Sequence, residues 1–65
     1  MSFYSLFEQL QTGDMFHYDE SCIVIERHDF KKCIELIIQT SNDTFSLFLD
    51  KEKFTVMHDD GYYIV

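Results

Sequence analysis

The spacing of apolar residues changes once along this chain, and that change limits the folds it can adopt. Phe3, Leu6, Phe7 and Leu10 recur at helical spacing, which places them on one face of an α-helix. From Asp14 onward the apolar residues form short β-branched and aromatic runs separated by polar clusters. That second pattern is typical of an antiparallel meander. The chain therefore predicts one short helix followed by a sheet.

The predicted helix covers residues 2–11. Ser2 can cap its N-terminus, and Gly13 can end it, because glycine readily takes the left-handed conformation found after helices. A helix this short is not stable alone in water. Its apolar face is therefore expected to pack on the sheet.

Six strands are expected after the helix. The sequence Asp59-Asp60-Gly61 lies between the last two of them, and Asp-Gly strongly favours a tight hairpin turn. The predicted strands cover residues 15–18, 21–27, 32–40, 44–49, 54–58 and 62–65.

The second and third strands are expected to form a hairpin around a turn at residues 28–31. This register places Cys22 opposite Ile37 and Cys33 opposite Glu26. The two thiols are then too far apart for a disulfide, and we expect both to be free. The side chains expected on the core side of the sheet are Ile23, Ile25, Ile34, Leu36, Ile38, Phe45, Leu47 and Leu49.

With 65 residues, the chain is expected to form a single domain, residues 1–65, near the lower size limit for an independent core. Its aromatic content of 17% argues against disorder. A core this small also makes a homodimer possible. The start of the chain lacks the basic and apolar segments of a signal peptide, and no run is long enough to span a membrane. We expect a cytoplasmic protein.

The charge of the chain is strongly negative and unevenly distributed. Twelve acids face five bases, which gives a net charge of −7. Five of the acids precede Arg27 with no Lys or Arg among them, and all bases fall between Arg27 and Lys53. A negative field repels nucleic acid and membrane surfaces and attracts basic protein surfaces. The expected partner is therefore a protein with a basic surface.

Two resemblances add to these patterns. The stretch Thr12-Gly13-Asp14-Met15-Phe16, followed after a polar turn by Cys22-Ile23-Val24-Ile25-Glu26, resembles the opening of small SH3-like barrels. The whole chain, short, acidic and rich in Tyr, Phe and Asp, is similar in character to small early proteins of bacteriophages. That resemblance implies a protein that binds and inhibits a host enzyme, in some cases by imitating DNA, in the host cytoplasm.

The base-free N-terminal third, together with the last turn and its tyrosines, is the expected partner-binding surface. Turn propensity explains many of the acids, because Asp favours turns, but it does not require the absence of bases before Arg27. Tyrosine is enriched in interface cores, although the C-terminal tyrosines could instead complete the protein core. The residues assigned to this surface are Glu8, Asp14, Asp19, Glu20, Asp59, Asp60, Tyr62 and Tyr63, with Asp14, Asp19 and Glu20 as its centre.

Chemical sites have less support. His17, Asp19, Glu20 and Cys22 carry possible metal donors, but structural zinc sites require four well-spaced ligands, and ordinary polar residues at a strand end explain this group better. A nucleophilic cysteine needs a histidine held against it, and no pattern here supplies one. We expect no cofactor, metal or catalytic residue.

These observations lead to one expected fold and two expected functions. The fold is α+β, a short N-terminal helix packed on a five- or six-stranded antiparallel sheet, possibly an SH3-like barrel. The favoured function is a non-enzymatic acidic protein that binds and inhibits or modulates another protein. In its specific form this is a phage-type inhibitor or DNA mimic that occupies the basic site of a host nucleic-acid enzyme. The alternative is an adaptor or regulatory module that binds its partner through an aromatic surface.

Overall fold

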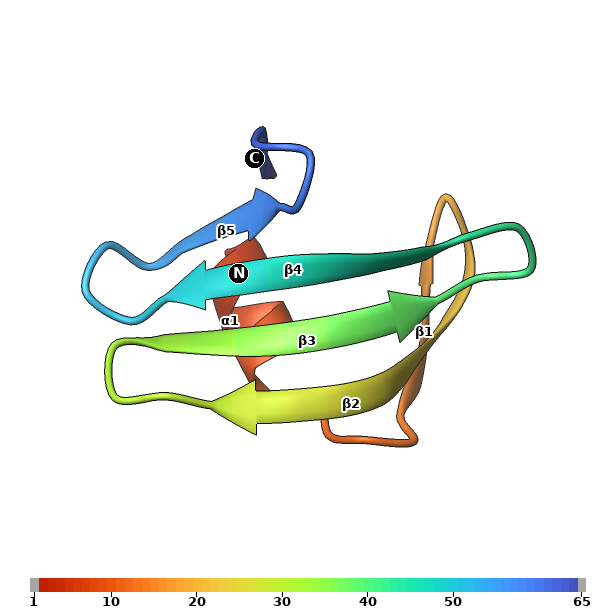
Figure 1. Cartoon of the computed structure of the whole chain (residues 1–65), viewed down its shortest axis with the longest axis horizontal. Helices are drawn as coiled ribbons and strands as arrows, with labels where there is room; N and C mark the ends of the chain where they lie inside the picture. Colours follow the sequence, from red (N-terminus) through yellow and green to blue (C-terminus); the bar gives the residue numbers. More distant parts are fainter. Residues whose placement is uncertain (1, 65) are drawn as a thin grey trace.

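The computed structural model describes residues 2–64 and contains one helix and a six-stranded sheet (Figure 1). All strands pair antiparallel with their neighbours in chain order, which confirms the expected meander. Among the described residues, no helix has the length and apolar character needed to cross a membrane. The elements are α1 (Phe3–Glu8), β1 (Met15–Tyr18), β2 (Glu20–Asp29), β3 (Cys33–Gln39), β4 (Thr44–Asp50), β5 (Thr55–His58) and β6 (Tyr63–Ile64).

The sheet curves into a half-barrel, and α1 lies behind β3 and β4 in the view of Figure 1. We call the face that α1 covers the inner face and the opposite face the outer face. Side chains alternate between the two faces along each strand. The buried strand residues, which define the inner face, are Cys22, Val24, Ile34, Leu36, Ile38, Leu47, Leu49, Val56 and Ile64.

The helix packs through aromatic side chains. The Ser2 side chain accepts a hydrogen bond from the Ser5 N–H at 3.2 Å, so the expected N-cap is confirmed. Phe7 is 1% exposed, and its ring meets the rings of Phe16 and Tyr18 edge-on, with centroid distances of 5.7 and 6.3 Å. The curved sheet therefore surrounds the helix from β1 as well as from β4 and β5.

The expected buried face of the helix was wrong in one position. Tyr4 is buried beside Phe7, and Phe3 and Leu10 pack partly against the core, but Leu6 is 47% exposed. The helix ends at Glu8 instead of near residue 11, and it sits inside a curved sheet. The buried sector is therefore centred on Phe7 and turned toward Tyr4, which leaves Leu6 on the solvent side.

The expected register of the second and third strands was also wrong. Glu26, expected opposite Cys33, pairs with Ile37, and the turn occupies residues 30–32. The reason is that β2 continues two residues into the expected turn and ends at Asp29. Because turn length fixes hairpin register, an error in the turn moves every pair in the ladder.

A β-bulge in β2 explains which of its side chains reach the core. The pairing shifts between Val24 and Glu26, which leaves Ile25 as the extra residue. A bulge interrupts the alternation of side chains along its strand. The inward side chains before it are therefore Cys22 and Val24, whereas Ile23 and Ile25, which we expected in the core, are only half-buried. The core positions expected on β3 and β4 are confirmed.

Beyond the bulge, Arg27 points inward and holds the end of the helix. Its side chain is 12% exposed, and Nη1 donates to the carbonyl oxygens of Glu8 and Leu10 at 2.8 and 2.6 Å. The same guanidinium donates through Nε and Nη2 to both carboxylate oxygens of Asp29, at 2.8 and 3.1 Å. The hydrogen bonds to Glu8 and Leu10 satisfy the carbonyl of the last helical residue and one just beyond the helix, neither of which has a partner within the helix.

We predict that Phe7→Ala destabilises the protein by about 3–5 kcal/mol, the cost of truncating a fully buried phenylalanine. Domains of this kind have a total stability of about 5–15 kcal/mol, so urea unfolding followed by circular dichroism should show a large loss. Leu6→Ala is the matched control on the exposed side of the helix, and it should change stability far less. Equal effects from both variants would contradict the packing of α1 described above.

A second prediction concerns the pair formed by Arg27 and Asp29. The hydrogen bond from Arg27 lowers the pKa of Asp29. The ionised carboxylate therefore stabilises the fold above the ordinary Asp pKa of about 3.9, and this contribution is lost as the pH falls through the lowered pKa of the folded state. Wild type should exceed Asp29→Asn in urea midpoint at neutral pH, and the difference should shrink as the pH falls below the ordinary Asp pKa and through the lowered pKa of the folded state.

The control for this prediction is the same substitution in an Arg27→Lys background. A lysine cannot form the two-pronged hydrogen bond of a guanidinium. In that background, the pH-dependent difference caused by Asp29→Asn should therefore shrink. A difference that stays constant from neutral pH to about pH 3 in the presence of Arg27 would show that Arg27 does not set the ionisation of Asp29.

Candidate functional site

Three connections meet at one end of the half-barrel and enclose a hollow of about 270 Å³. They are the turn between β1 and β2, the loop between β3 and β4, and the turn between β5 and β6. In Figure 1 the first two project together at the end opposite the β2–β3 and β4–β5 turns. We call this hollow the acidic pocket; it is lined by Tyr18, Asp19, Glu20, Cys22, Thr40, Asp43, Phe45, His58, Asp60 and Tyr62.

The turn between β1 and β2 supplies two carboxylates. Asp19 is the single residue at its apex, between the paired Tyr18 and Glu20, and it has a φ of 63°. Aspartate adopts this left-handed conformation more readily than most residues. Glu20 accepts a hydrogen bond from the Ser41 hydroxyl at 3.2 Å, which ties this turn to the β3–β4 loop.

A stack of three rings forms the aromatic wall of the pocket. Phe45 and His58 are nearly parallel with centroids 4.9 Å apart, and His58 and Tyr62 follow at 4.7 Å. The hairpin turn makes this possible, because the His58 N–H donates to the Tyr62 carbonyl at 2.8 Å and Gly61 has a φ of 99°. The expected Asp-Gly turn is thus confirmed, and it folds Tyr62 back over His58.

The His58 ring is also held at its edge. Nδ1 lies 2.9 Å from Asp59 Oδ1 and 3.1 Å from the backbone nitrogen of Asp60, which donates to it. Asp59 in turn accepts the N–H of Ser46 at 3.0 Å. The donor atoms of these three consecutive residues, His58, Asp59 and Asp60, lie within 4.8 Å of one another. One histidine and two carboxylates fall short of the four ligands of a structural zinc site, and these groups already hold the turn.

The structure brings together only part of the surface predicted from the sequence. The predicted residues that line the acidic pocket are Asp19, Glu20, Asp60 and Tyr62, and Asp59 lies beside it through His58.

The other predicted residues lie elsewhere. Asp14 is at the opposite end of β1, about 17 Å from Asp19 along an extended strand, and its carboxylate accepts the Gln11 N–H. Glu8 ends α1 beside Arg27. Tyr63 is on the outer face, because its neighbour Ile64 is buried on the inner face.

Sequence reasoning missed six of the residues that line the pocket, among them the acid Asp43 and two rings of the aromatic wall, Phe45 and His58. Phe45 was expected only as core, and Asp43 only as a turn residue. The role of Asp43 was concealed because acids and bases balance in the middle of the sequence but lie apart in the fold. Asp43 reaches the acidic pocket, whereas all four lysines lie in the β2–β3 and β4–β5 turns, at residues 31–32 and 51–53.

The cysteines and His17 do not form a chemical site in the described part of the chain. Burial raises the pKa of Cys22, whose thiol donates to the Glu20 carbonyl at 3.3 Å. A neutral, hydrogen-bonded thiol is a poor nucleophile. Cys33 is also free, and it lies on the outer face because its neighbour Ile34 is buried inside. His17 pairs with Ser21, one position before the inward Cys22, so it points to the outer face.

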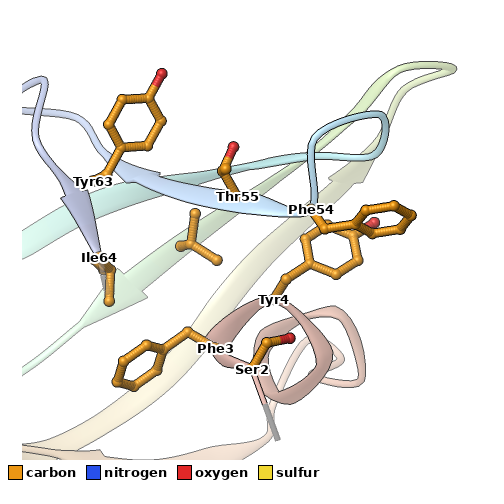
Figure 2. A pocket seen from close by; sticks show the side chains of 8 residues that line it. Ser2, Phe3, Tyr4, Phe54, Thr55, Tyr63 and Ile64 are labelled. Carbon is orange, nitrogen blue, oxygen red and sulfur yellow. The ribbon is translucent and has the colours of Figure 1, made fainter.

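A larger hollow of about 390 Å³ lies between α1 and the β5–β6 edge (Figure 2). Phe3 and Ile64 stand on one side of it, and Tyr4 and Phe54 meet edge-on at the other, with centroids 5.3 Å apart. Its described lining contains no charged side chain. It therefore offers apolar contact but no group for electrostatic recognition.

The acidic pocket combines carboxylates from three connections with a flat aromatic wall. Carboxylates and aromatic faces both attract cations, so this arrangement can bind a positively charged group. In comparisons with known proteins, no family model, no curated protein and no solved structure matches this chain.

Proposed function

We propose that this protein is a non-enzymatic acidic protein that binds the basic surface of a partner protein through the acidic pocket. The observation that carries the proposal is the separation of charge in the fold. Four acids line the pocket, and no Lys or Arg belongs to its lining within residues 2–64. The four lysines occupy the turns at the other end of the sheet.

The chemistry of the pocket suits a basic partner in two ways. Its carboxylates attract a positive surface over a distance and accelerate the encounter. Tyr62, the last ring of the aromatic stack, is 54% exposed, and its ring adds a contact at short range. Guanidinium groups stack on aromatic faces and pair with carboxylates. A lysine or arginine of the partner would therefore meet both kinds of group at once.

In its specific form, the proposal is that the protein inhibits a host nucleic-acid enzyme, as phage-type inhibitors and DNA mimics do. Duplex DNA presents about one negative charge per 1.7 Å of axis, and a close group of carboxylates competes for the same basic groove. The protein itself would then bind neither nucleic acid nor membranes and would act in the host cytoplasm. We also propose that the half-barrel is related to SH3-like barrels.

This proposal predicts the effect of removing charge from the pocket. The triple variant Asp19→Asn, Glu20→Gln and Asp60→Asn keeps shape and hydrogen-bonding capacity, and such surface changes usually cost within about 0.5 kcal/mol each. Both proteins should serve as baits in a bacterial lysate at low salt, with quantitative mass spectrometry. Wild type should capture a DNA- or RNA-handling enzyme, and the variant should associate with it about tenfold more slowly and with a weaker salt dependence.

A control variant removes the same number of charges away from the pocket, as Glu8→Gln, Asp14→Asn and Glu52→Gln. Asp43 and Asp59 are left unchanged in both variants, so that each variant loses three charges. The asparagine introduced in place of Asp14 keeps an oxygen that can accept the Gln11 N–H. The control should bind nearly as wild type does. Equal losses in both triples would mean that only overall charge matters, and unchanged capture by the pocket variant would overturn the proposal.

A further inference from the structure

We propose that the outer face of the sheet is a second protein-binding surface, which takes an apolar patch flanked by Lys or Arg side chains on a partner protein. This surface lies apart from the acidic pocket and does not depend on it. Such a surface would serve the alternative function, an adaptor or regulatory module that binds its partner through aromatic residues.

The centre of the outer face is an apolar row across three strands. Phe48 of β4 pairs directly with Met57 of β5, and Met57 pairs with Tyr63 of β6. Directly paired residues on adjacent strands lie about 5 Å apart, so the three side chains form a continuous strip. Tyr63 is 56% exposed, and Figure 2 shows its ring on the side of β5 opposite Phe3 and Tyr4.

No described element covers this strip, since α1 packs on the inner face (Figure 1). The uncovered face of an antiparallel sheet is normally polar. Here it carries a phenylalanine, a methionine and a tyrosine in a row, the residue types enriched in the cores of protein interfaces. A hollow of about 120 Å³ lies beside them, next to Cys33 and Asp50, and can receive one apolar side chain of a partner.

The charges around the strip indicate a basic partner. Glu35 is the direct neighbour of Phe48 in the same row. Glu26 lies in the next row of the outer face, where it pairs with the half-buried Ile37, two residues after Glu35 on β3. No Lys or Arg belongs to the outer face of the described strands, because Arg27 points inward and the lysines are in turns. His28 lies at the end of the same row, paired with Glu35, and its Nε2 lies 3.2 Å from the Glu26 carboxylate, so Glu35 is the acid that a basic partner would meet beside Phe48. A partner surface with Lys or Arg at the edge of its apolar patch complements this arrangement.

The same charges argue against a second copy of this chain on the strip. A two-fold dimer brings the same patch of both copies together, so Glu35 of each copy would approach the other copy's acids beside Phe48. Like charges brought together across an interface are unfavourable, and each copy carries a net charge of −7. The occupant is therefore a different protein.

The test is a nuclear magnetic resonance titration of the isotope-labelled protein with three amphipathic peptides: leucine with lysine, leucine with glutamate, and serine with lysine. The leucine–lysine peptide should shift the resonances of Glu35, Phe48, Met57 and Tyr63. The leucine–glutamate peptide should leave the strip unchanged, because charge is part of the recognition. The serine–lysine peptide should leave it unchanged as well, because the apolar contact is missing.

Three variants test which side chains bind the leucine–lysine peptide. Phe48→Thr, Met57→Thr and Tyr63→Thr together keep strand-favouring residues and should weaken binding of the leucine–lysine peptide about tenfold or more. The matched control removes exposed apolar area elsewhere, as Leu6→Gln with Phe54→Asn, and should bind as wild type does. Glu35→Gln should reduce the salt dependence of binding. If the threonine variant does not fold, the map of shifts on wild type decides the outcome.

Three results would overturn the proposal: shifts by the leucine–lysine peptide that avoid the strip, equal binding of the leucine–glutamate peptide there, or a concentration-dependent dimer in sedimentation that the threonine variant abolishes. Binding of the serine–lysine peptide near Asp19 and Asp60 reports on the acidic pocket alone. The two surfaces can therefore succeed or fail separately.

Discussion

One extra residue in β2, Ile25, decides which side chains of that strand reach the core. Before the bulge, Val24 packs inward; after it, the next inward side chain is Arg27. The bulge thus brings a guanidinium to the end of the helix, where it donates to the carbonyl oxygens of Glu8, the last helical residue, and of Leu10 just beyond it. Ile25, as the extra residue, lies outside the core, and Ile23 does so because it alternates with the inward Cys22 and Val24. The bulge bends β2, and the contact of Arg27 with the end of α1 follows from this position.

The curvature has a functional consequence at the other end of the molecule. A flat meander would keep the β1–β2 and β5–β6 turns apart, because they belong to opposite edges of the sheet. The half-barrel instead brings both to one hollow with the β3–β4 loop between them. The acids of those connections then surround one volume, where a bound cation would relieve their mutual repulsion. The lysines stay at the far end and do not neutralise this field.

The two proposed surfaces divide recognition between different forces. The acidic pocket acts through charge, which governs the rate of encounter and its dependence on salt. The outer strip of Phe48, Met57 and Tyr63 acts through apolar contact, which governs how long a complex lasts once it has formed. Both surfaces favour a partner rich in Lys and Arg. A protein of 65 residues with two such faces can contact one partner on two sides or join two partners.

The sequence by itself determined the elements of this protein: the helix from the spacing around Phe7, six strands from the β-branched and aromatic runs, and the Asp-Gly hairpin before Tyr62. These depend on local periodicity and turn chemistry, which residues near in sequence decide. The proposal of a basic partner also began with the sequence, from the absence of Lys and Arg before Arg27, which turn propensity does not require.

Only the tertiary structure decided the register of β2 and β3, the inward direction of Val24 and the exposure of Leu6. A bulge and a turn length change pairings by whole residues, and neither has a distinct signal in this sequence. The sequence likewise predicted only part of the pocket, namely Asp19, Glu20, Asp60 and Tyr62. Asp43, Phe45 and His58 reach the pocket because the sheet curves. Asp14 does not, because β1 places it about 17 Å from Asp19, and Glu8 does not, because it ends α1 beside Arg27. Which side chains share a surface is a property of long-range pairing, and composition cannot supply it.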